Sequence, residues 1–207
     1  IDNEDKVRML IDPTSDYARA AAMSMGRAMD EVLIDAALGN AFTGVSGGTT
    51  VAGQTPIAAG ATGLTLAKLL SAKETMDGDD VPENGRVIVC TSEQISDLLN
   101  TTEIKSSDFN TVKALARGEI DSFLGFEFVS VNGKRIDGTK LVPVDGSSDR
   151  RCFAFQNEGL LLGVGADMTT KISERADKNY ATQVFCSMSI GGTRMEEARV
   201  LEILCAE

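Results

Sequence analysis

A helix-forming segment near the start of the chain constrains the fold more than any other feature of the sequence. Asp12, Pro13 and Asp16 supply a cap, a first-turn proline and an early acid. Apolar and small residues then recur at helical spacing until Gly39, a residue type that commonly ends helices. The pattern predicts a helix over residues 14–38, about 37 Å long at 1.5 Å per residue and about twice the common length. Such a helix is a long, rigid element against which other elements can pack.

Two shorter helices and a buried strand are expected in the next part of the chain. Residues 39–63 are rich in glycine, threonine and alanine, which predicts an irregular loop and a boundary between two lobes. A helix is expected over residues 64–76, and the β-branched run at 86–90 predicts a buried strand. Thr91 and Gln94 have the spacing of a capping box, which would open a helix that ends near residue 99.

The second half of the chain changes from helical to strand-like patterns, and this order predicts an α+β fold. A helix is expected over residues 108–117, before the change. Residues 126–131 alternate in polarity and meet Asn132-Gly133, a pair typical of tight β-hairpins. Further strands are expected over residues 152–155, 168–175, 181–190 and 199–205.

Four of the eight phenylalanines lie within residues 108–128, at Phe109, Phe123, Phe126 and Phe128. A platform for nucleic-acid bases would surround these rings with lysine and arginine, but acidic residues lie beside them. We therefore expect the rings to pack a helix against a strand. The residues expected in the structural core are Met25, Met29, Leu33, Phe126, Phe128, Val184 and Met188.

Charge and residue content exclude several classes of function. The 31 acidic and 20 basic residues give a formal net charge of -11, which argues against a protein whose main function is to bind nucleic acid. Histidine is absent, which removes Ser-His-Asp and Cys-His nucleophile systems and histidine zinc sites. No apolar run approaches the ~20 residues of a membrane span, so no membrane partner is expected. The four widely spaced cysteines favour reduced, buried thiols over two disulfides.

The strongest candidate for a metal site is an acidic cluster formed by Asp77, Asp79, Asp80 and Glu83. An EF-hand loop would need a ligand where Val81 stands, so we expect a solvated turn, with weak calcium binding as the alternative. Residues 39–44 have the glycine spacing of a phosphate loop but lack its lysine. We expect no catalytic residue, no cofactor site and no metal site.

Several segments of the chain resemble segments of one known protein family, and they occur in the same order as in that family. The long helix ends in RAMDEVLIDAALG (residues 27–39), and Thr43-Gly44 follows. The other segments are DKVR (5–8), NGRVIVCTSEQISDLLN (84–100), SSDFNTVKALARGEIDSFLGFEFV (106–129) and RADKNYATQVFCSMSIGGTRMEEARVLEI (175–203). Together they resemble the major capsid proteins of tailed bacteriophages over nearly the full chain.

The resemblance implies the Hong Kong 97-type capsid fold, an α+β fold with a peripheral domain and an inserted axial domain. It places the spine helix, about 14–38, and the following loop in residues 1–59 of the peripheral domain. It places the axial domain at 60–158 and the return strands of the peripheral domain at 159–207. The family also carries an N-terminal arm and an extended loop, which we expect to precede Ile1, where no signal-peptide pattern is present.

The function implied by the resemblance is that of a structural subunit of an icosahedral phage capsid. Such subunits self-assemble into pentamers and hexamers and enclose packaged double-stranded DNA without sequence-specific binding. The implied partners are other copies of the chain and scaffolding, portal and decoration proteins, with assembly in the bacterial host cytoplasm and a final place in the virion. The alternatives are an encapsulin-like compartment shell, a metal-dependent small-molecule enzyme and a monomeric binding module.

Overall fold

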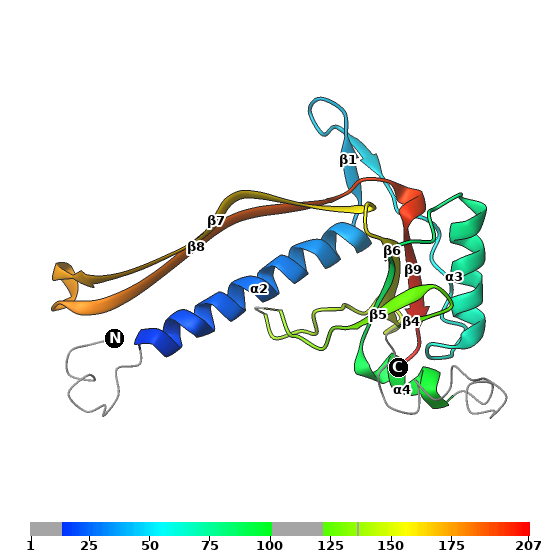
Figure 1. Ribbon diagram of the computed structural model, residues 1–207, viewed down its shortest axis with the longest axis horizontal. Coiled ribbons are helices and arrows are strands. Elements are labelled where there is room, and N and C mark those ends of the chain that lie inside the picture. The colour runs from blue at the N-terminus through cyan, green and yellow to red at the C-terminus, as the bar shows by residue number, and fades with distance from the viewer. Residues whose placement is uncertain (1–13, 101–121, 136) are drawn as a thin grey trace. The chain divides into compact units, whose positions relative to one another are not determined.

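A five-stranded mixed sheet organises the larger part of the chain (Figure 1). The computed structural model describes residues 14–100, 122–135 and 137–207. The strand order is β4-β5-β3-β6-β9, and β3 runs parallel to β5 and antiparallel to β6. The strands are β3 (Arg86–Cys90), β4 (Ser122–Phe123), β5 (Phe126–Ser130), β6 (Arg150–Gln156) and β9 (Val200–Cys205).

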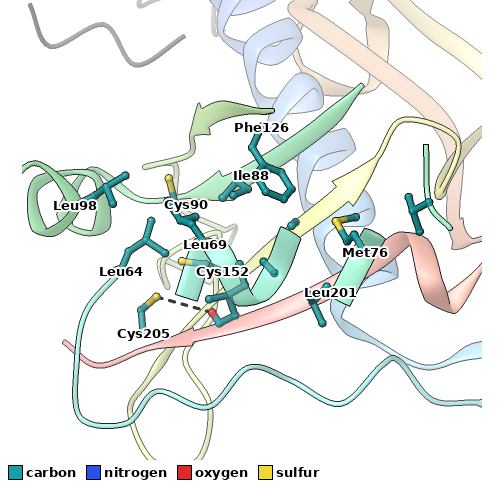
Figure 2. Packing of buried hydrophobic residues seen from close by; sticks show 14 residues of the cluster. Leu64, Leu69, Met76, Ile88, Cys90, Leu98, Phe126, Cys152, Leu201 and Cys205 are labelled. Atoms are coloured by element: carbon teal, nitrogen blue, oxygen red, sulfur yellow. Dashed lines mark hydrogen bonds between the residues drawn. The ribbon is translucent and has the colours of Figure 1, made fainter. Parts of the chain in front are cut away.

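Both faces of the sheet are covered at its central strand, so every residue of β3 is buried. Helices α3 (Leu66–Gly78) and α4 (Ser92–Asn100) contribute Leu69, Met76 and Leu98 to the core on one face (Figure 2). The core on the other face contains the end of the long helix α2 (Thr14–Leu38) and the segment 141–142. Alternate residues of β3 point to the two cores, as the two-residue period of a strand requires.

The chain divides into two units. The sheet unit contains Leu33–Leu161 and Gly192–Glu207. The ribbon unit contains the described residues up to Val32 together with Leu162–Gly191. In the ribbon unit, β7 (Leu160–Arg175) and β8 (Ala181–Arg194) form a long two-stranded sheet, joined by the short 3-10 helix η1 (Ala176–Lys178). A second 3-10 helix, η2 (Glu197–Arg199), precedes β9 in the sheet unit.

Several predicted elements are confirmed. Helix α2 has the predicted bounds, and β3 matches the predicted strand at 86–90. The capping box is present, because Gln94 Oε1 accepts hydrogen bonds from the Thr91 amide at 3.2 Å and from the Thr91 hydroxyl. Strands β7 and β8 extend well beyond the predicted strands and make a longer ribbon than the residue pattern indicated.

Two local predictions are wrong. Residues 39–63 are not all irregular, because β1 (Ala41–Thr43) and β2 (Thr49–Val51) form a small hairpin there. Asn132-Gly133 does not close a tight hairpin after β5, since β5 pairs with β4 and, in parallel, with β3. Instead, Asn132 Oδ1 accepts a hydrogen bond from the Ser92 amide at 2.9 Å, at the start of α4. The helix expected over 108–117 and Phe109 lie outside the described residues.

The last strand belongs to the central sheet. β9 pairs with β6 along its whole length, whereas most of β7 and β8 lies in the ribbon unit. The domain boundaries that the resemblance implied stay a prediction. Five of the six residues of the final strand are apolar, and the sixth, Glu202, pairs with Arg151 of β6. This composition suits a covered sheet.

Candidate functional site

The residues predicted for the structural core occupy two kinds of surroundings. Phe126 is fully buried against α3 and β3, and Phe128 on the same face of β5 is half-buried against the same core. The remaining members are half-buried, because their elements have one face near solvent: Met25, Met29 and Leu33 in α2, and Val184 and Met188 in β8. Only the phenylalanines therefore lie at the covered central sheet.

The ribbon presents apolar side chains at its surface. Val164, Met168 and Ile172 follow each other at every fourth position of β7 and are 50%, 39% and 55% exposed. Residues four apart in a strand point to the same face, so these three form one line, which we call the β7 stripe. Exposed large apolar residues that are aligned in this way indicate a surface that contacts another molecule.

The hairpin of β1 and β2 is a second exposed apolar feature. Its tip carries Val45, which is fully exposed, and Phe42 is 67% exposed beside it. Gly44 and Gly47 take positive φ angles of 88° and 63°, a conformation that glycine adopts without steric cost. The glycine-rich sequence that suggested a loop thus makes a tight turn that presents apolar side chains.

A buried arginine fixes the base of this hairpin to the end of the long helix. Arg194 is buried, and its Nη1 donates to the carbonyl oxygens of Ala37 at 3.1 Å and Gly39 at 2.8 Å. Its Nη2 donates to the Val51 carbonyl at 3.1 Å. The guanidinium satisfies carbonyls at a helix C-terminus, where positive charge is favourable. Sequence reasoning missed Arg194, because a single arginine near the end of a strand carries no pattern.

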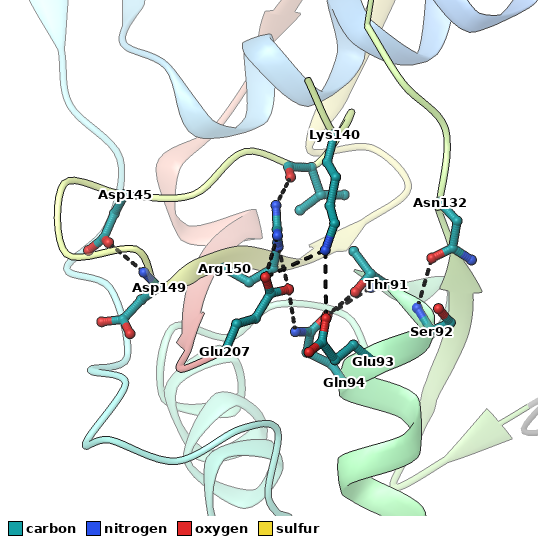
Figure 3. Close-up of polar contacts among 11 residues, drawn as sticks. Thr91, Ser92, Glu93, Gln94, Asn132, Lys140, Asp145, Asp149, Arg150 and Glu207 are labelled. Atoms are coloured by element: carbon teal, nitrogen blue, oxygen red, sulfur yellow. Dashed lines mark hydrogen bonds and ion pairs between the residues drawn. The ribbon is translucent and has the colours of Figure 1, made fainter. Parts of the chain in front are cut away.

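A cluster of charged and polar side chains binds the carboxylate of Glu207, the last residue described (Figure 3). Arg150 binds both carboxylate oxygens of Glu207, with its Nε donating to Oε1 at 2.6 Å. Gln94 Nε2 donates to the same carboxylate at 3.1 Å, and Lys140 Nζ lies 3.5 Å from it. The hydrogen bonds from Arg150 dominate and lower the pKa of Glu207 to about 2. This cluster connects β6, the start of α4 and the end of β9.

Two carboxylates of the acidic cluster that was considered as a metal site, Asp77 and Glu83, pair with basic side chains. Arg86 Nη1 donates to Asp77 at 2.6 Å and lowers the pKa of that carboxyl, and Lys73 Nζ lies 3.5 Å from Asp77. Lys73 also pairs with Glu83 at 3.2 Å, and Asp79 accepts a hydrogen bond from a glutamine. Within the described residues, no group of three or more histidine, cysteine or acidic side chains could hold a metal ion.

The cysteines are free, and most serve the packing of the sheet. Cys90, Cys152 and Cys205 are fully buried on neighbouring strands. Burial raises the pKa of the Cys90 thiol to about 12, so it stays neutral at physiological pH. The prediction of four buried thiols is wrong for Cys186, which is half-buried in the ribbon.

Most buried polar side chains in the described part of the chain thus pair with other groups of the protein, and Gln54 Oε1 and Arg194 Nε are buried without a hydrogen-bond partner there. Several large apolar residues are exposed. None of the helices within the described residues has the length and hydrophobicity to span a bilayer. The exposed apolar residues and the paired charges favour contact between protein molecules over catalysis on a small-molecule substrate.

A comparison with protein families identifies the chain. The family model described as "Phage capsid protein" matches residues 1–207. The chain belongs to the phage capsid protein family. No match was found among curated proteins.

Solved structures of phage capsids share the fold. The capsid of cyanophage P-SCSP1u matches with a TM-score of 0.72 at 20% identity, over 100% of this chain and 70% of that chain. A structure from Mycobacterium phage Che8 gives 0.67 at 19% identity, over 98% and 67%. The head structure of Helicobacter pylori bacteriophage KHP40 gives 0.67 at 12% identity, over 94% and 69%. The chain thus has the α+β fold of Hong Kong 97-type capsid proteins.

Family and fold together give the function class: the chain is a structural subunit of an icosahedral phage capsid. A structural role points away from enzyme activity, and a capsid subunit belongs to the virion. The family match also favours the phage capsid over the encapsulin-like compartment shell.

Proposed function

We propose that copies of this chain self-assemble into the pentamers and hexamers of a shell that encloses double-stranded DNA. The observation that carries the proposal is the lack of a core in the ribbon unit. Among the described residues, Ala181 is the one buried apolar residue of that unit, whereas both hydrophobic cores lie in the sheet unit. An isolated two-stranded sheet is at best marginally stable in water. Assembly would supply the missing cover.

The elements have natural roles in such a shell. We infer that α2 is the spine helix, that the ribbon unit forms much of the peripheral domain, and that the central sheet forms the axial domain. Phe126 and Phe128 would then stabilise the axial domain. Met25, Met29, Leu33, Val184 and Met188 would stabilise the peripheral domain, where their half-burial in a single chain leaves room for further cover. This assignment ascribes structural roles to all seven residues and catalysis to none.

The remaining partners follow from the same role. We expect the shell to enclose DNA without sequence-specific binding, because a net charge of -11 gives the chain little attraction for DNA phosphates. Portal, scaffolding and decoration proteins are the other expected partners, and assembly is expected in the cytoplasm of the bacterial host. A metal-dependent enzyme has little support from the acidic cluster, because Asp77 and Glu83 pair with Arg86 and Lys73.

Negative-stain electron microscopy of the full-length protein tests this function. The protein is produced alone and together with its neighbouring phage genes. We expect closed, uniform, hollow shells, with DNA inside those made in the presence of the packaging genes. Shells that contain an enzyme cargo instead would support the compartment alternative, and small discrete particles under every condition would contradict the shell function.

A further inference from the structure

We propose that Asn84 is a site of spontaneous modification, at which the folded chain loses ammonia and gains a carboxylate. Asn84 and Gly85 form the turn that leads into β3. In an Asn-Gly pair, the backbone nitrogen of the glycine can attack the side-chain carbonyl carbon of the asparagine, because no glycine side chain shields that nitrogen. This reaction goes beyond the proposed function, since it needs only a single chain.

The reaction needs water and no other reagent. The bond from Gly85 N to Asn84 Cγ forms and the bond from Cγ to Nδ2 breaks, while the proton of Gly85 N leaves with Nδ2 as part of ammonia. The product is a five-membered succinimide ring. Water then opens this ring at one of its two carbonyl groups and gives either aspartate or isoaspartate, in which the backbone runs through the former side chain.

The structure leaves the reacting groups of Asn84 and Gly85 without partners. Asn84 is exposed. Within the described residues, its side-chain amide makes no hydrogen bond, and the N–H of Gly85 makes none with a backbone carbonyl. The attacking nitrogen and the leaving nitrogen are therefore both free of protein contacts that would have to break first.

The fold also requires the glycine that makes Asn84 reactive. Gly85 has a positive φ of 73°, and a Cβ atom there would lie 2.7 Å from Asn157 Nδ2. The carbonyl oxygen of Gly85 accepts a hydrogen bond from the Asn157 amide at 3.0 Å. A larger residue after Asn84 would disturb this contact, so the chain keeps the reactive pair.

A second Asn-Gly pair in the chain is held in the opposite state. Asn132 Nδ2 donates to Ser130 Oγ at 2.9 Å, and Asn132 Oδ1 accepts from the Ser92 amide at 2.9 Å (Figure 3). The side chain must rotate toward Gly133 before the ring can close, so both hydrogen bonds must open. The same dipeptide thus occurs once protected and once unprotected.

The three Asp-Gly pairs of the chain could form the same ring, but each carboxylate accepts a hydrogen bond. These carboxylates belong to Asp77, Asp137 and Asp145. The hydrogen bonds lower the pKa of Asp77 and Asp137, so both stay ionised, and an ionised carboxylate reacts poorly with a nucleophile. Asn84 is therefore the site that the structure favours.

The products alter a turn that is bound to the end of β6. Both products place a negative charge beside Glu83. Isoaspartate also removes the carbonyl group of residue 84 from the main chain, although its oxygen accepts a hydrogen bond from Gln156 Nε2 at 3.4 Å in the unmodified chain. We expect isoaspartate to weaken the contact between this turn and β6.

Tryptic peptide mapping of the folded, unassembled protein tests the proposal. The mass shift of deamidation is followed during incubation in mildly alkaline buffer on peptides 74–86 and 118–134. Each peptide contains one asparagine and no glutamine. Isomerisation of aspartate leaves the mass unchanged, so the shift reports asparagine alone. We expect Asn84 to react at least about tenfold faster than Asn132, because two hydrogen bonds protect Asn132.

Two variants and a denatured sample serve as controls. Asn84→Gln should abolish the shift on peptide 74–86, since glutamine would have to close a larger ring. Ser130→Ala removes one protecting hydrogen bond, so it should speed the reaction of Asn132 by at least about threefold and leave Asn84 unchanged. In denaturant the two asparagines should react at rates within about threefold of each other, because the protection is lost.

Two results would overturn the proposal. The first is a rate at Asn84 in the folded protein that is equal to or below the rate at Asn132. The second is a difference that persists unchanged in denaturant, since the neighbouring residues in the sequence would then set the rates. Neither result would bear on the formation of shells.

Discussion

Single buried cations bind backbone carbonyl groups from different segments of the sheet unit. Lys68 Nζ donates to the carbonyl oxygens of Thr62, Gly63 and Leu204 at 2.7–2.9 Å. Burial lowers the pKa of this lysine, but three oxygens around the ammonium compensate for the lost water. Arg194 does the same for the end of α2 and for β2. These contacts join segments that are far apart in the sequence.

The carboxylate of Glu207 gives a prediction at the same scale. Arg150 holds the folded-state pKa of Glu207 at about 2, below the ordinary value of 4.5. A lowered carboxyl pKa adds stability above pH 4.5, and that contribution is lost as the pH falls from 4.5 towards 2. We expect Glu207→Gln to lower the free energy of unfolding by about 2 kcal/mol at pH 7, a value reduced for solvent screening, and by less at pH 3.

Denaturant unfolding at the two pH values measures this difference. Glu83→Gln is the matched control, because that carboxylate is mostly exposed in its pair with Lys73 and should have little effect at either pH. An equal loss from Glu207→Gln at pH 7 and pH 3 would show that the contact with Arg150 acts through packing and not through charge.

At the scale of elements, β5 depends on one aromatic anchor. Phe126 is fully buried in the core beneath α3, opposite Arg86 of β3 in the parallel register. We expect Phe126→Ala to lower the free energy of unfolding by about 3–5 kcal/mol, because it leaves a cavity in a core shared by several strands. Val129→Ala, on the exposed face of the same strand, is the control and should change stability by less than about 0.5 kcal/mol.

Equilibrium denaturation of the unassembled protein gives both values. A midpoint for Phe126→Ala within error of the unmodified protein would mean that β5 is dispensable for the sheet. The same measurement tests the packing role that was predicted for Phe126.

Local rules located the elements better than they located the pairings. The cap residues and helical spacing before Gly39 predicted α2 with its observed bounds, because a helix is stabilised by contacts within a few residues. The hairpin predicted from Asn132-Gly133 is wrong, because the hairpin rule assumes that consecutive strands pair, whereas β5 pairs in parallel with β3. Parallel pairing depends on contacts distant in sequence and leaves little local signal.

At the scale of the whole molecule, the two units should differ in stability before assembly. The sheet unit contains both hydrophobic cores, and the ribbon unit has one buried apolar residue among those described. We expect amide hydrogens of residues 162–191 to exchange at least about tenfold faster than those of β3 and β6 in the unassembled protein. In shells the exchange of the ribbon should slow towards that of the sheet.

Hydrogen exchange with mass spectrometry on the two forms provides the measurement. The amides of β3 are the internal reference, since they are buried in both forms. Ribbon amides that are as slow as those of β3 before assembly would show that the ribbon is stable alone, and the argument for its cover by neighbouring copies would lose its energetic basis.

The sequence by itself determined the α+β class, the long helix, the buried strand at 86–90 and the packing role of Phe126. Each depends on short-range periodicity, capping or residue chemistry. The resemblance in ordered segments determined the family, and absent histidine argued against several kinds of catalysis.

Only the tertiary structure decided which strands pair and which charges are buried. It placed β9 in the central sheet, Arg194 at the end of α2, and the apolar face of β7 in solvent. The physical reason is that these features are contacts between residues far apart in the chain. Their free energy depends on burial, and an isolated run of residues carries no record of what will cover it.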